Sequence, residues 1–364
     1  MSKKFEMFFV SMVMMFLLAA CGGNNEESPE ANNNDTEVKE ENAEANGANE
    51  EAAADAEFTI RAGIGLNNEH PQYKGLEKFK EIVEEETDGA IHVETYHSGQ
   101  LGDDRTMMEA LQLGSQEVTV PSTAPIANFV SDFSIFDFPF LFPNSEVADE
   151  VLDGEVGQKF LDKLDDQNLK GLAYWENGFR DLTNSEKEVA SVDDFEGLTI
   201  RTMENDLHLD AFRAMGANPT PMAFTELFTA LQQGTVDGQE NPFATIYLEG
   251  FYEVQDYVSD THHIYSPFVF LMSKSFYDTL PEDYQEVVDN AALEAGKYQR
   301  ELNREANDEY LDSLVEEGMT FTEISDEARE EMRLAIEPVV EEYAAELDQD
   351  LVNEVYQAIE DAQK

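Results

Sequence analysis

From residue 58 onward the sequence alternates between strand-like and helix-like segments, and this alternation limits the possible folds more than any other feature. Residues 58–63 and 91–96 have strand patterns, and 118–120 forms a short apolar strand. Between them, residues 71–87 and 104–113 place apolar side chains at helical spacing. The resulting order of strand, helix, strand, helix and strand predicts an α/β fold with a mostly parallel, doubly wound sheet.

A short internal echo suggests that this α/β pattern occurs twice. The segment Glu109–Gly114 (EALQLG) is similar to Thr229–Gly234 (TALQQG). In each copy a predicted helix ends at a glycine and a short segment then leads to a polar or proline-containing turn. The echo favours two similar lobes over one large domain. Two facing lobes form a cleft, and open α/β sheets bind ligands at the carboxyl ends of their strands.

The last third of the chain is predicted to be helical. Residues 283–317 and 326–362 carry apolar side chains at helical spacing, interspersed with many acidic residues. Pro338 lies inside the second pattern and is expected to break or kink that helix. The heptads are irregular, so we expect amphipathic helices laid across both lobes rather than a coiled coil that binds a partner.

The N-terminus has the pattern of an export signal. Lys3 and Lys4 precede an apolar stretch, residues 8–20, that is too short to span a bilayer as a helix. The following Leu-Ala-Ala-Cys resembles a bacterial lipobox, which predicts a lipoprotein signal peptide over residues 1–20 and lipidation of Cys21. The alternative is an ordinary cleavage site with a coincidental cysteine.

The segment after the lipobox, residues 21–57, is rich in Asn, Glu, Ala and Gly, and is predicted to be an acidic disordered tether. We therefore expect an extracytoplasmic protein that is lipid-anchored to the outer face of the cell membrane. The chain holds one cysteine, which excludes a disulfide framework and a cysteine-based zinc cluster.

The charge of the chain excludes further classes of protein. Lys and Arg number 22 against 79 Asp and Glu, for a formal net charge of −57. Nucleic-acid binding depends on basic residues that neutralise phosphates, so no nucleic-acid partner is expected. An acidic excess spread along the whole chain favours adaptation to a saline or alkaline exterior, and the alternative is a specific cationic partner.

Basic residues are scarce in the middle of the chain, so the few arginines there are informative. Arg201 ends the strand-like segment 197–201, where a side chain points toward the ligand crevice. Arg180 follows an aromatic segment that contains glycine. A guanidinium group pairs with a carboxylate through two parallel hydrogen bonds, which favours an anionic ligand. The alternative for each arginine is a structural ion pair with one of the abundant acids.

Several longer motifs resemble one known family. Residues 216–224 (GANPTPMAF) continue through 231–234 (LQQG) to 236–242 (VDGQENP), and the run resembles substrate-binding proteins of tripartite ATP-independent periplasmic (TRAP) transporters. This family is typified by the C4-dicarboxylate binder. Segments 98–102 and 267–274, together with Phe-Pro-Phe-Leu-Phe at 138–142, are also similar. The resemblance covers roughly residues 58 to 350.

The resemblance implies a two-lobed periplasmic-binding-protein-like α/β fold with long C-terminal helices crossing both lobes. We expect lobe I at 58–177, lobe II at 178–265, and a helical region at 266–364 that completes and bridges both. The implied function is an extracytoplasmic solute receptor, not an enzyme, that needs no cofactor. It would bind an organic acid, either a C4-dicarboxylate or a sugar acid such as a uronate. It would deliver this ligand to the small and large membrane subunits of a TRAP transporter.

The resemblance also implies roles for individual residues. Arg201 would hold the ligand carboxylate, Asn241 would assist it, and Arg180 would be a second contact. Asn241 precedes a proline, which keeps its backbone extended and its side chain directed. The remaining implied contacts are Phe224 on the ligand body, Ser122 at a position that varies with ligand type, and His70 and Gln100 at the border of the cleft. Their alternatives are a core position for Phe224, a helix-start role for His70 and a turn role for Gln100.

Other chemistry has weaker support in the sequence. His262 and His263 are adjacent on a predicted strand and would point to opposite faces, so no metal site is expected there. No phosphate-binding loop, nucleophile elbow or His-Glu-x-x-His stretch occurs. Two other functions stay open: a sensor that presents its ligand to a membrane histidine kinase, and an extracellular hydrolase.

Overall fold

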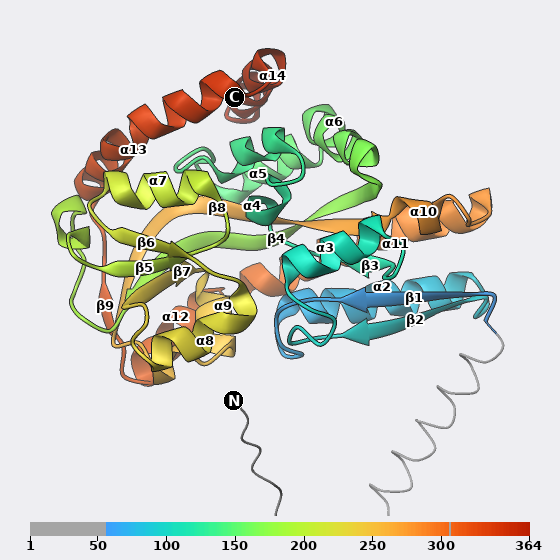
Figure 1. The fold of residues 1–364 in the computed structure, drawn as a ribbon, viewed down its shortest axis with the longest axis horizontal. Helices are drawn as coiled ribbons and strands as arrows, with labels where there is room; N and C mark the ends of the chain where they lie inside the picture. The colour runs from blue at the N-terminus through green and yellow to red at the C-terminus, as the bar shows by residue number, and fades with distance from the viewer. Residues whose placement is uncertain (1–55, 306) are drawn as a thin grey trace, which may run out of the picture. The chain divides into compact units, whose positions relative to one another are not determined.

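One nine-stranded sheet organises residues 56–305 and 307–364, the part of the chain that the computed structural model describes (Figure 1). Its strands are β1 (Phe58–Gly63), β2 (Ile91–Tyr96), β3 (Val118–Thr119), β4 (Leu169–Asn184), β5 (Thr199–Thr202), β6 (Asn218–Pro221), β7 (Gly238–Asn241), β8 (Tyr257–Ser273) and β9 (Thr320–Thr322). They lie in the order β2-β1-β3-β8-β4-β7-β5-β6, and β9 pairs with β8.

Each end of the sheet is a parallel β-α-β-α-β unit, as the alternation predicts. Strand β1 pairs in parallel with β2 and β3, and β5 pairs in parallel with β6 and β7. The connecting helices are α2 (Pro71–Glu86) and α3 (Asp104–Gln112) in the first unit, and α7 (Asp206–Ala214) and α8 (Phe224–Gln232) in the second. The two units are the similar lobes that the echo in the sequence suggested.

The centre of the sheet is antiparallel, so the prediction of a mostly parallel sheet is wrong there. Strands β4 and β8 pair antiparallel with each other, and they also pair antiparallel with β7 and β3, respectively. These strands have 16 and 17 residues, and each runs from one unit into the other (Figure 1). Their ladder shifts register three times, including between Glu176 and Gly178. A local apolar pattern indicates a strand but not its partner or direction, so the sequence could not reveal this pairing.

The two echoed helix ends have the same geometry. Gly114 and Gly234 both adopt the left-handed conformation, with φ of 69° and 64°. The residue after each glycine donates its N–H to the carbonyl of Ala110 or Ala230, at 2.9 Å in both cases. This bond closes the helix end around the glycine, which confirms the predicted repeat.

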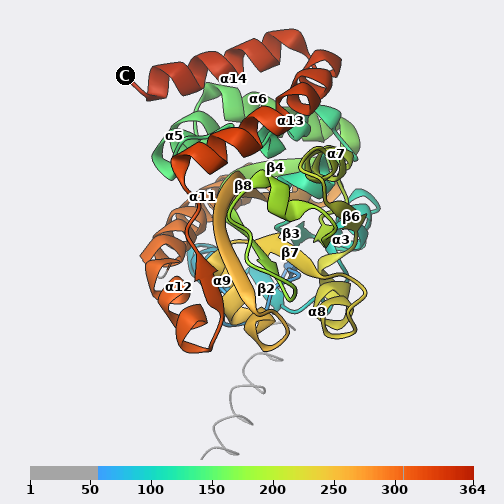
Figure 2. The ribbon, with the colours of Figure 1, turned by 90° about the vertical axis from the view of Figure 1, so that its left-hand side faces the viewer.

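Long C-terminal helices cover both units, as predicted. They are α11 (Glu282–Glu305), α12 (Asn307–Glu316), α13 (Asp326–Glu346) and α14 (Gln349–Ala362). Helix α11 packs against α2 and β4, α12 against α9 (Phe243–Leu248), and α13 against α7. Figure 2 shows α13 and α14 along one side, where α14 packs on α5 (Ser145–Leu152) and α6 (Glu155–Lys163). The shorter elements are α4 (Thr123–Ile126), α10 (Lys274–Tyr277), and the 3-10 turns η1 (Ser131–Asp137), η2 (Leu164–Gln167), η3 (Val192–Phe195) and η4 (Phe251–Glu253).

Pro338 does not break its helix, which was one of the two effects expected of it. Helix α13 runs through it and stops at Glu346, followed by the extended residue Leu347. Pro338 is exposed, so the carbonyl group that loses its helical partner can bond to water. Met332 and Ile336, six and two residues earlier, are buried and anchor the helix on its inner face.

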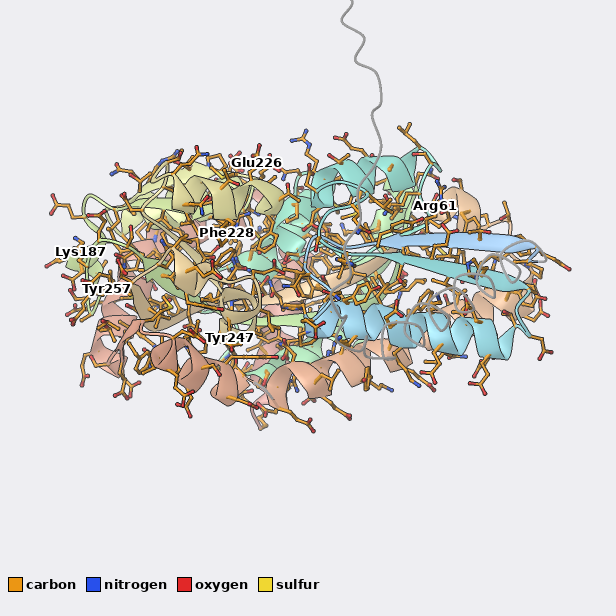
Figure 3. The ribbon with its side chains drawn as sticks, turned by 90° about the horizontal axis from the view of Figure 1, so that it is seen from below. Arg61, Lys187, Glu226, Phe228, Tyr247 and Tyr257 are labelled. Atoms are coloured by element: carbon orange, nitrogen blue, oxygen red, sulfur yellow. The ribbon has the colours of Figure 1, made fainter. Side chains whose placement is uncertain are left out.

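Apolar side chains form four buried clusters around the sheet. Under α2 and α11, Trp175 and Phe270 lie with ring centroids 5.3 Å apart. In the opposite unit Tyr247 of α9, labelled in Figure 3, stacks on Tyr252 and Tyr310, with centroids 5.5 Å away in each case. Within the described residues, no helix is both long and apolar enough to cross a bilayer. The predicted signal peptide, Cys21 and the tether up to residue 55 lie outside the described residues.

Candidate functional site

A cavity opens where the strands of the two parallel units end. The space in it that is free of protein atoms measures about 610 Å³, part of which is open to solvent. Its walls come from segments that follow β1, β3, β5 and β6, from the end of β7, and from the middle of β4. These are the carboxyl ends of parallel strands, the position where open α/β sheets bind ligands. The lining residues are Gly65, Leu66, Gln72, Asp103, Asp104, Arg105, Ser122, Pro125, Asn177, Arg180, Arg201, Met203, Glu204, Met222, Ala223, Phe224, Asn241, Thr245 and Phe268.

Arg201 is a buried cation whose hydrogen bonds leave one nitrogen unused. It lies on β5 with 2% of its surface exposed. Its Nε and Nη2 donate to the carbonyl oxygen of Met222 at 2.9 and 2.6 Å. Among the described residues, no acceptor lies within hydrogen-bond distance of its Nη1, although that atom is buried. A buried donor without a partner is costly, so this nitrogen is a strong candidate to bind an oxygen of a ligand.

The charge of Arg201 persists at neutral pH. Burial lowers the pKa of Arg201 to about 10, and the nearby charge of Arg180 adds to this effect. The carboxylates of Glu240, Asp104 and Glu204 oppose the shift. A group with this pKa remains protonated at neutral pH, so the cavity keeps a positive charge on the side of β5.

Arg180 differs from Arg201 because it has a carboxylate partner. Its Nε and Nη2 donate to Glu240 Oε2 and Oε1 at 2.5 and 2.8 Å, and both residues are fully buried. His263 Nε2 lies 3.2 Å from Glu240 Oε2. Burial alone would raise the pKa of Glu240, but Arg180 and His263 outweigh burial and hold that pKa well below its usual range. Like Arg201, Arg180 has a buried Nη1 without a partner among the described residues.

Three more of the predicted contacts line the same cavity. Asn241, at the end of β7, is buried and donates one amide hydrogen to Gln239 Oε1 at 2.5 Å. Its second amide hydrogen therefore remains available. Phe224 begins α8 and is half-buried, with its ring centroid 6.0 Å from that of Phe251. Ser122 precedes α4, and its side chain makes no capping hydrogen bond to that helix.

His70 and Gln100 are not among the lining residues. His70 is fully buried at the start of α2, where its Nδ1 accepts from the backbone N–H of Gln72 at 3.1 Å. Its Nε2 lies 3.1 Å from Thr245 Oγ1, so it contacts two lining residues from behind the wall. Gln100 has an exposed side chain in a turn, and its N–H donates to the carbonyl of His97. The positions of these two residues match their alternatives from the sequence, which were a helix-start role for His70 and a turn role for Gln100.

The sequence reasoning missed several polar residues of the wall. Gln72 lies on α2, Asn177 on β4, Glu204 after β5, and Asp104 opens α3. Burial raises the pKa of Asp104 to about 7, and the neighbouring Asp103 adds to the shift. Asn177 stands three residues before Arg180, and Asp104 follows the Gly-Gln-Leu-Gly segment that resembles the family. Both sequence segments pointed to regions near the cavity, but they did not show which of their side chains line it.

The two adjacent histidines engage different acids. His262 Nδ1 lies 2.8 Å from Asp181 Oδ1, whereas His263 contacts Glu240. Within the described residues, no three His, Cys, Asp or Glu side chains gather as a metal site. His263 thus belongs to the buried group behind the cavity, formed with Arg180 and Glu240.

Comparison with known proteins gives the same picture. The C4-dicarboxylate-binding periplasmic protein DctP of Rhodobacter capsulatus is 36% identical over 75% of this chain and 83% of its own length. A sugar acid binding protein from Advenella mimigardefordensis, solved with galactonate, is 45% identical with a TM-score of 0.82, covering 84% of this chain and 98% of that one. A TRAP periplasmic solute binding protein from a Polaromonas species, bound to D-erythronate, is 38% identical with a TM-score of 0.80, covering 82% and 98%.

The family match extends over most of the described region. Residues 62–347 match the DctP family, described as bacterial extracellular solute-binding protein, family 7. That range includes both parallel units, the central strands and most of the C-terminal helices. The chain therefore belongs to family 7 of the bacterial extracellular solute-binding proteins, the receptors of TRAP transporters.

Proposed function

We propose that this protein captures an organic acid in the cavity between its two units and delivers it to the membrane subunits of a TRAP transporter. The observation that carries the proposal is the pair of buried arginines that line the cavity, each with an Nη1 that has no partner among the described residues. A carboxylate supplies the charged acceptors that such donors need. The solved relatives that hold galactonate and erythronate support this ligand class. A C4-dicarboxylate and a sugar acid are the two candidate ligands.

The site residues predicted from the sequence have different proposed roles. Arg201 would hold the carboxylate, with Asn241 and Arg180 as further donors. Phe224 would pack on the ligand body, and Ser122 would offer a hydroxyl. His70 would act indirectly by fixing Thr245 and Gln72. Gln100 has no structural feature that supports a contact.

Capture would involve closure of one lobe on the other. The proposed lobes are residues 58–177 and 178–265, joined by the helical region 266–364. The first boundary falls at the register shift of β4 between Glu176 and Gly178, which supports a bend there. Closure excludes water and strengthens the pairing of charges. Small-angle scattering should show a smaller radius of gyration with ligand, and an unchanged radius would argue against closure.

Anchoring remains a proposal that rests on the sequence. Lipidation of Cys21 would hold the receptor at the outer face of the membrane, near the small and large subunits of the transporter. Metabolic labelling with palmitate should mark the wild-type chain and not a Cys21→Ala variant. Equal labelling of both would contradict the proposed anchor. Because the relatives are transport receptors, the sensor and hydrolase alternatives gain no support from them.

A thermal unfolding screen of the full chain against organic acids tests the proposed function. A ligand at about 100 times its dissociation constant stabilises the native state by about 2.7 kcal/mol, which raises Tm visibly. We expect at least one organic acid to raise Tm and uncharged sugars to leave it unchanged. A folded chain that responds to no organic acid would contradict the proposal.

A further inference from the structure

Of the arginines that line the cavity, Arg201 alone makes no direct ion pair with a described residue. Arg180 is already paired with Glu240, and Arg105 at the rim pairs with Glu109, with Nε and Oε1 3.2 Å apart. Arg201 is buried and, among the described residues, has no carboxylate within ion-pair distance; its bonds go to the carbonyl of Met222. A buried ion is stable only when it is paired. The cavity is therefore built to take up one carboxylate.

Two amide side chains, Gln72 of α2 and Asn177 of β4, also line the cavity. Gln72 donates its Nε2 to the carbonyl of Val120 at 2.7 Å, which fixes the orientation of the amide because the reversed amide would set oxygen against oxygen. Its Oε1 is then a buried acceptor with no donor among the described residues. Asn177 Oδ1 is also buried without a partner there.

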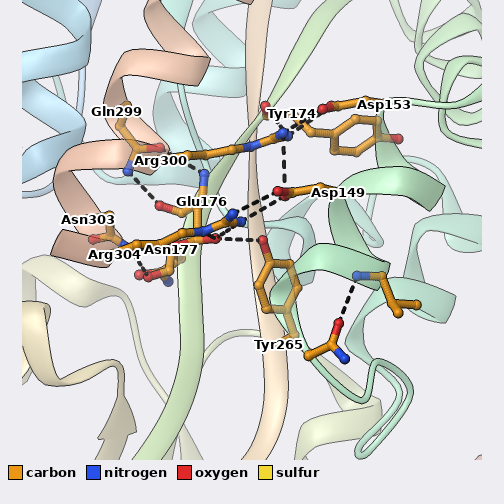
Figure 4. Close-up of polar contacts among 12 residues, drawn as sticks. Asp149, Asp153, Tyr174, Glu176, Asn177, Tyr265, Gln299, Arg300, Asn303 and Arg304 are labelled. Carbon is orange, nitrogen blue, oxygen red and sulfur yellow. Dashed lines mark hydrogen bonds and ion pairs between the residues drawn. The ribbon is translucent and has the colours of Figure 1, made fainter. Parts of the chain in front are cut away.

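Asn177 is held in place from behind. Its backbone carbonyl accepts from Asn303 Nδ2 of α11 at 3.1 Å, and Asn303 also bonds Glu176 (Figure 4). The polar atoms of its side chain make no hydrogen bond to a described residue and face a cavity that both units line. Because no hydrogen bond to a described residue fixes this amide, Asn177 can offer a ligand either its oxygen or its NH2 group. Its oxygen can accept from a hydroxyl group but not from an ionised carboxylate.

A third acceptor, Asp104, adds charge to the cavity wall above its pKa of about 7. Asp104 opens α3, lines the cavity, and takes a hydrogen bond from the backbone N–H of Ser122. Asp103 and Glu204 also line the cavity. A second carboxylate on the ligand would lie near these acidic side chains and near Arg180, whose charge Glu240 already neutralises. It would therefore lose its hydration without forming an ion pair in return. Hydroxyl groups can donate to Asp104 at no such cost.

We infer that the cavity selects polyhydroxylated monocarboxylic acids of the aldonate type over dicarboxylic acids. In this inference Gln72, Asn177 and Asp104 accept hydrogen bonds from the hydroxyl groups of the ligand. This inference rests on the proposed function and specifies its ligand class.

Matched pairs of acids test the selectivity. D-gluconate and D-glucarate share a hydroxylated carbon chain and differ only in a terminal carboxylate in place of a primary alcohol; erythronate and meso-tartrate form the corresponding four-carbon pair. Isothermal titration of the full chain should give at least roughly tenfold tighter binding of the aldonate in the pair that fits. Equal or tighter binding of the dicarboxylate, or binding of succinate alone, would overturn the inference and leave the receptor function standing. If no organic acid binds at all, the proposed function fails with it.

Two variants identify the selecting residues. Asp104→Asn keeps the size of the side chain and removes the charge that Asp104 carries above its pKa of about 7, so at about pH 8.5 the preference for gluconate over glucarate should fall roughly tenfold. Glu86→Gln makes the same charge change at an exposed position at the end of α2, away from the cavity, and should leave the preference unchanged. Gln72→Met removes the fixed acceptor and should weaken aldonate binding roughly ten- to hundredfold. If both binding-site variants fold with unchanged Tm and keep the wild-type preference and affinity, the assignment is wrong.

Discussion

At the scale of single residues, the two buried arginines of the cavity differ in their hydrogen-bond partners. Arg180 is locked to Glu240, so it contributes position and one free nitrogen but little net charge. Arg201 meets only a carbonyl oxygen, so its charge remains for a ligand. Both arginines stood out in the sequence because cations are scarce around them. Glu240 lies 60 residues from Arg180 along the chain, so only the folded chain shows which arginine is paired.

His70 gives a pH dependence whose sign follows from its burial. Burial lowers the pKa of His70 to about 3, from an ordinary value of 6.5. Between these values the unfolded chain binds a proton that the folded chain does not, so the imidazole destabilises the fold as pH falls below about 6.5. Protonation would also set a second N–H against that of Gln72.

Urea unfolding at pH 6.5 and pH 5 measures this contribution. His70→Asn keeps an acceptor at the start of α2 and does not titrate. We expect the wild-type chain to lose about 2 kcal/mol more stability than His70→Asn over this pH interval. His97→Asn, a change at a partly exposed histidine, is the matched control. Equal losses in the wild type and His70→Asn would show that His70 is not the source.

At the scale of elements, α11 is attached to the central strands by a buried polar group (Figure 4). Gln299 donates to the carbonyl and accepts from the N–H of Glu176, at 2.6 and 2.9 Å. Arg304 Nε donates to Glu176 Oε2 at 2.7 Å, and its Nη1 lies 2.8 Å from Asp149 Oδ2 on α5. The helix thereby connects β4 and α5 immediately beside Asn177. The sequence predicted the helix but gave no sign of these contacts, because their partners lie more than 100 residues away.

Arg304→Met should destabilise the chain by roughly 1–3 kcal/mol, because Glu176 would remain buried with a weaker set of donors. Arg333→Met is the matched control. Arg333 lies on α13 and pairs with Glu330 and Glu337 at the surface, where an ion pair contributes at most about 1 kcal/mol. Chemical denaturation of both variants makes the comparison. Equal effects would mean that the α11 contacts have no special weight.

The elements also show how far the sequence could predict the fold. The parallel units were predictable because each strand and helix has its own local period, and Gly114 and Gly234 mark matching helix ends. The pairing of the central antiparallel strands could not be predicted, because strand pairing and direction depend on residues far apart in sequence. The predicted helix break at Pro338 does not occur. Whether a proline breaks a helix depends on its exposure, and the sequence pattern does not reveal exposure.

At the scale of the whole molecule, the net charge of −57 makes stability depend on salt. Repulsion among the acids disfavours the compact state, and salt shortens the range of that repulsion from about 10 Å at 0.1 M to about 3 Å at 1 M. We expect Tm to rise by several degrees between these NaCl concentrations, and to rise less in sucrose of matched osmolality. A Tm that stays constant or falls would show that repulsion among the acidic side chains does not limit the stability of the fold.

Isothermal titration of an organic acid into the wild-type chain and an Arg201→Ala variant tests the receptor function most directly. The acid is the one that gives the largest thermal shift. We expect the variant to fold with a similar Tm and to bind more weakly by about 2–5 kcal/mol, because the ligand carboxylate would lose its only uncompensated cation. Arg213→Ala, at an exposed arginine paired with Asp210, should bind as the wild type does. Unchanged affinity in a folded Arg201→Ala variant would contradict the carboxylate site, and with it the proposed capture of an organic acid at this cavity.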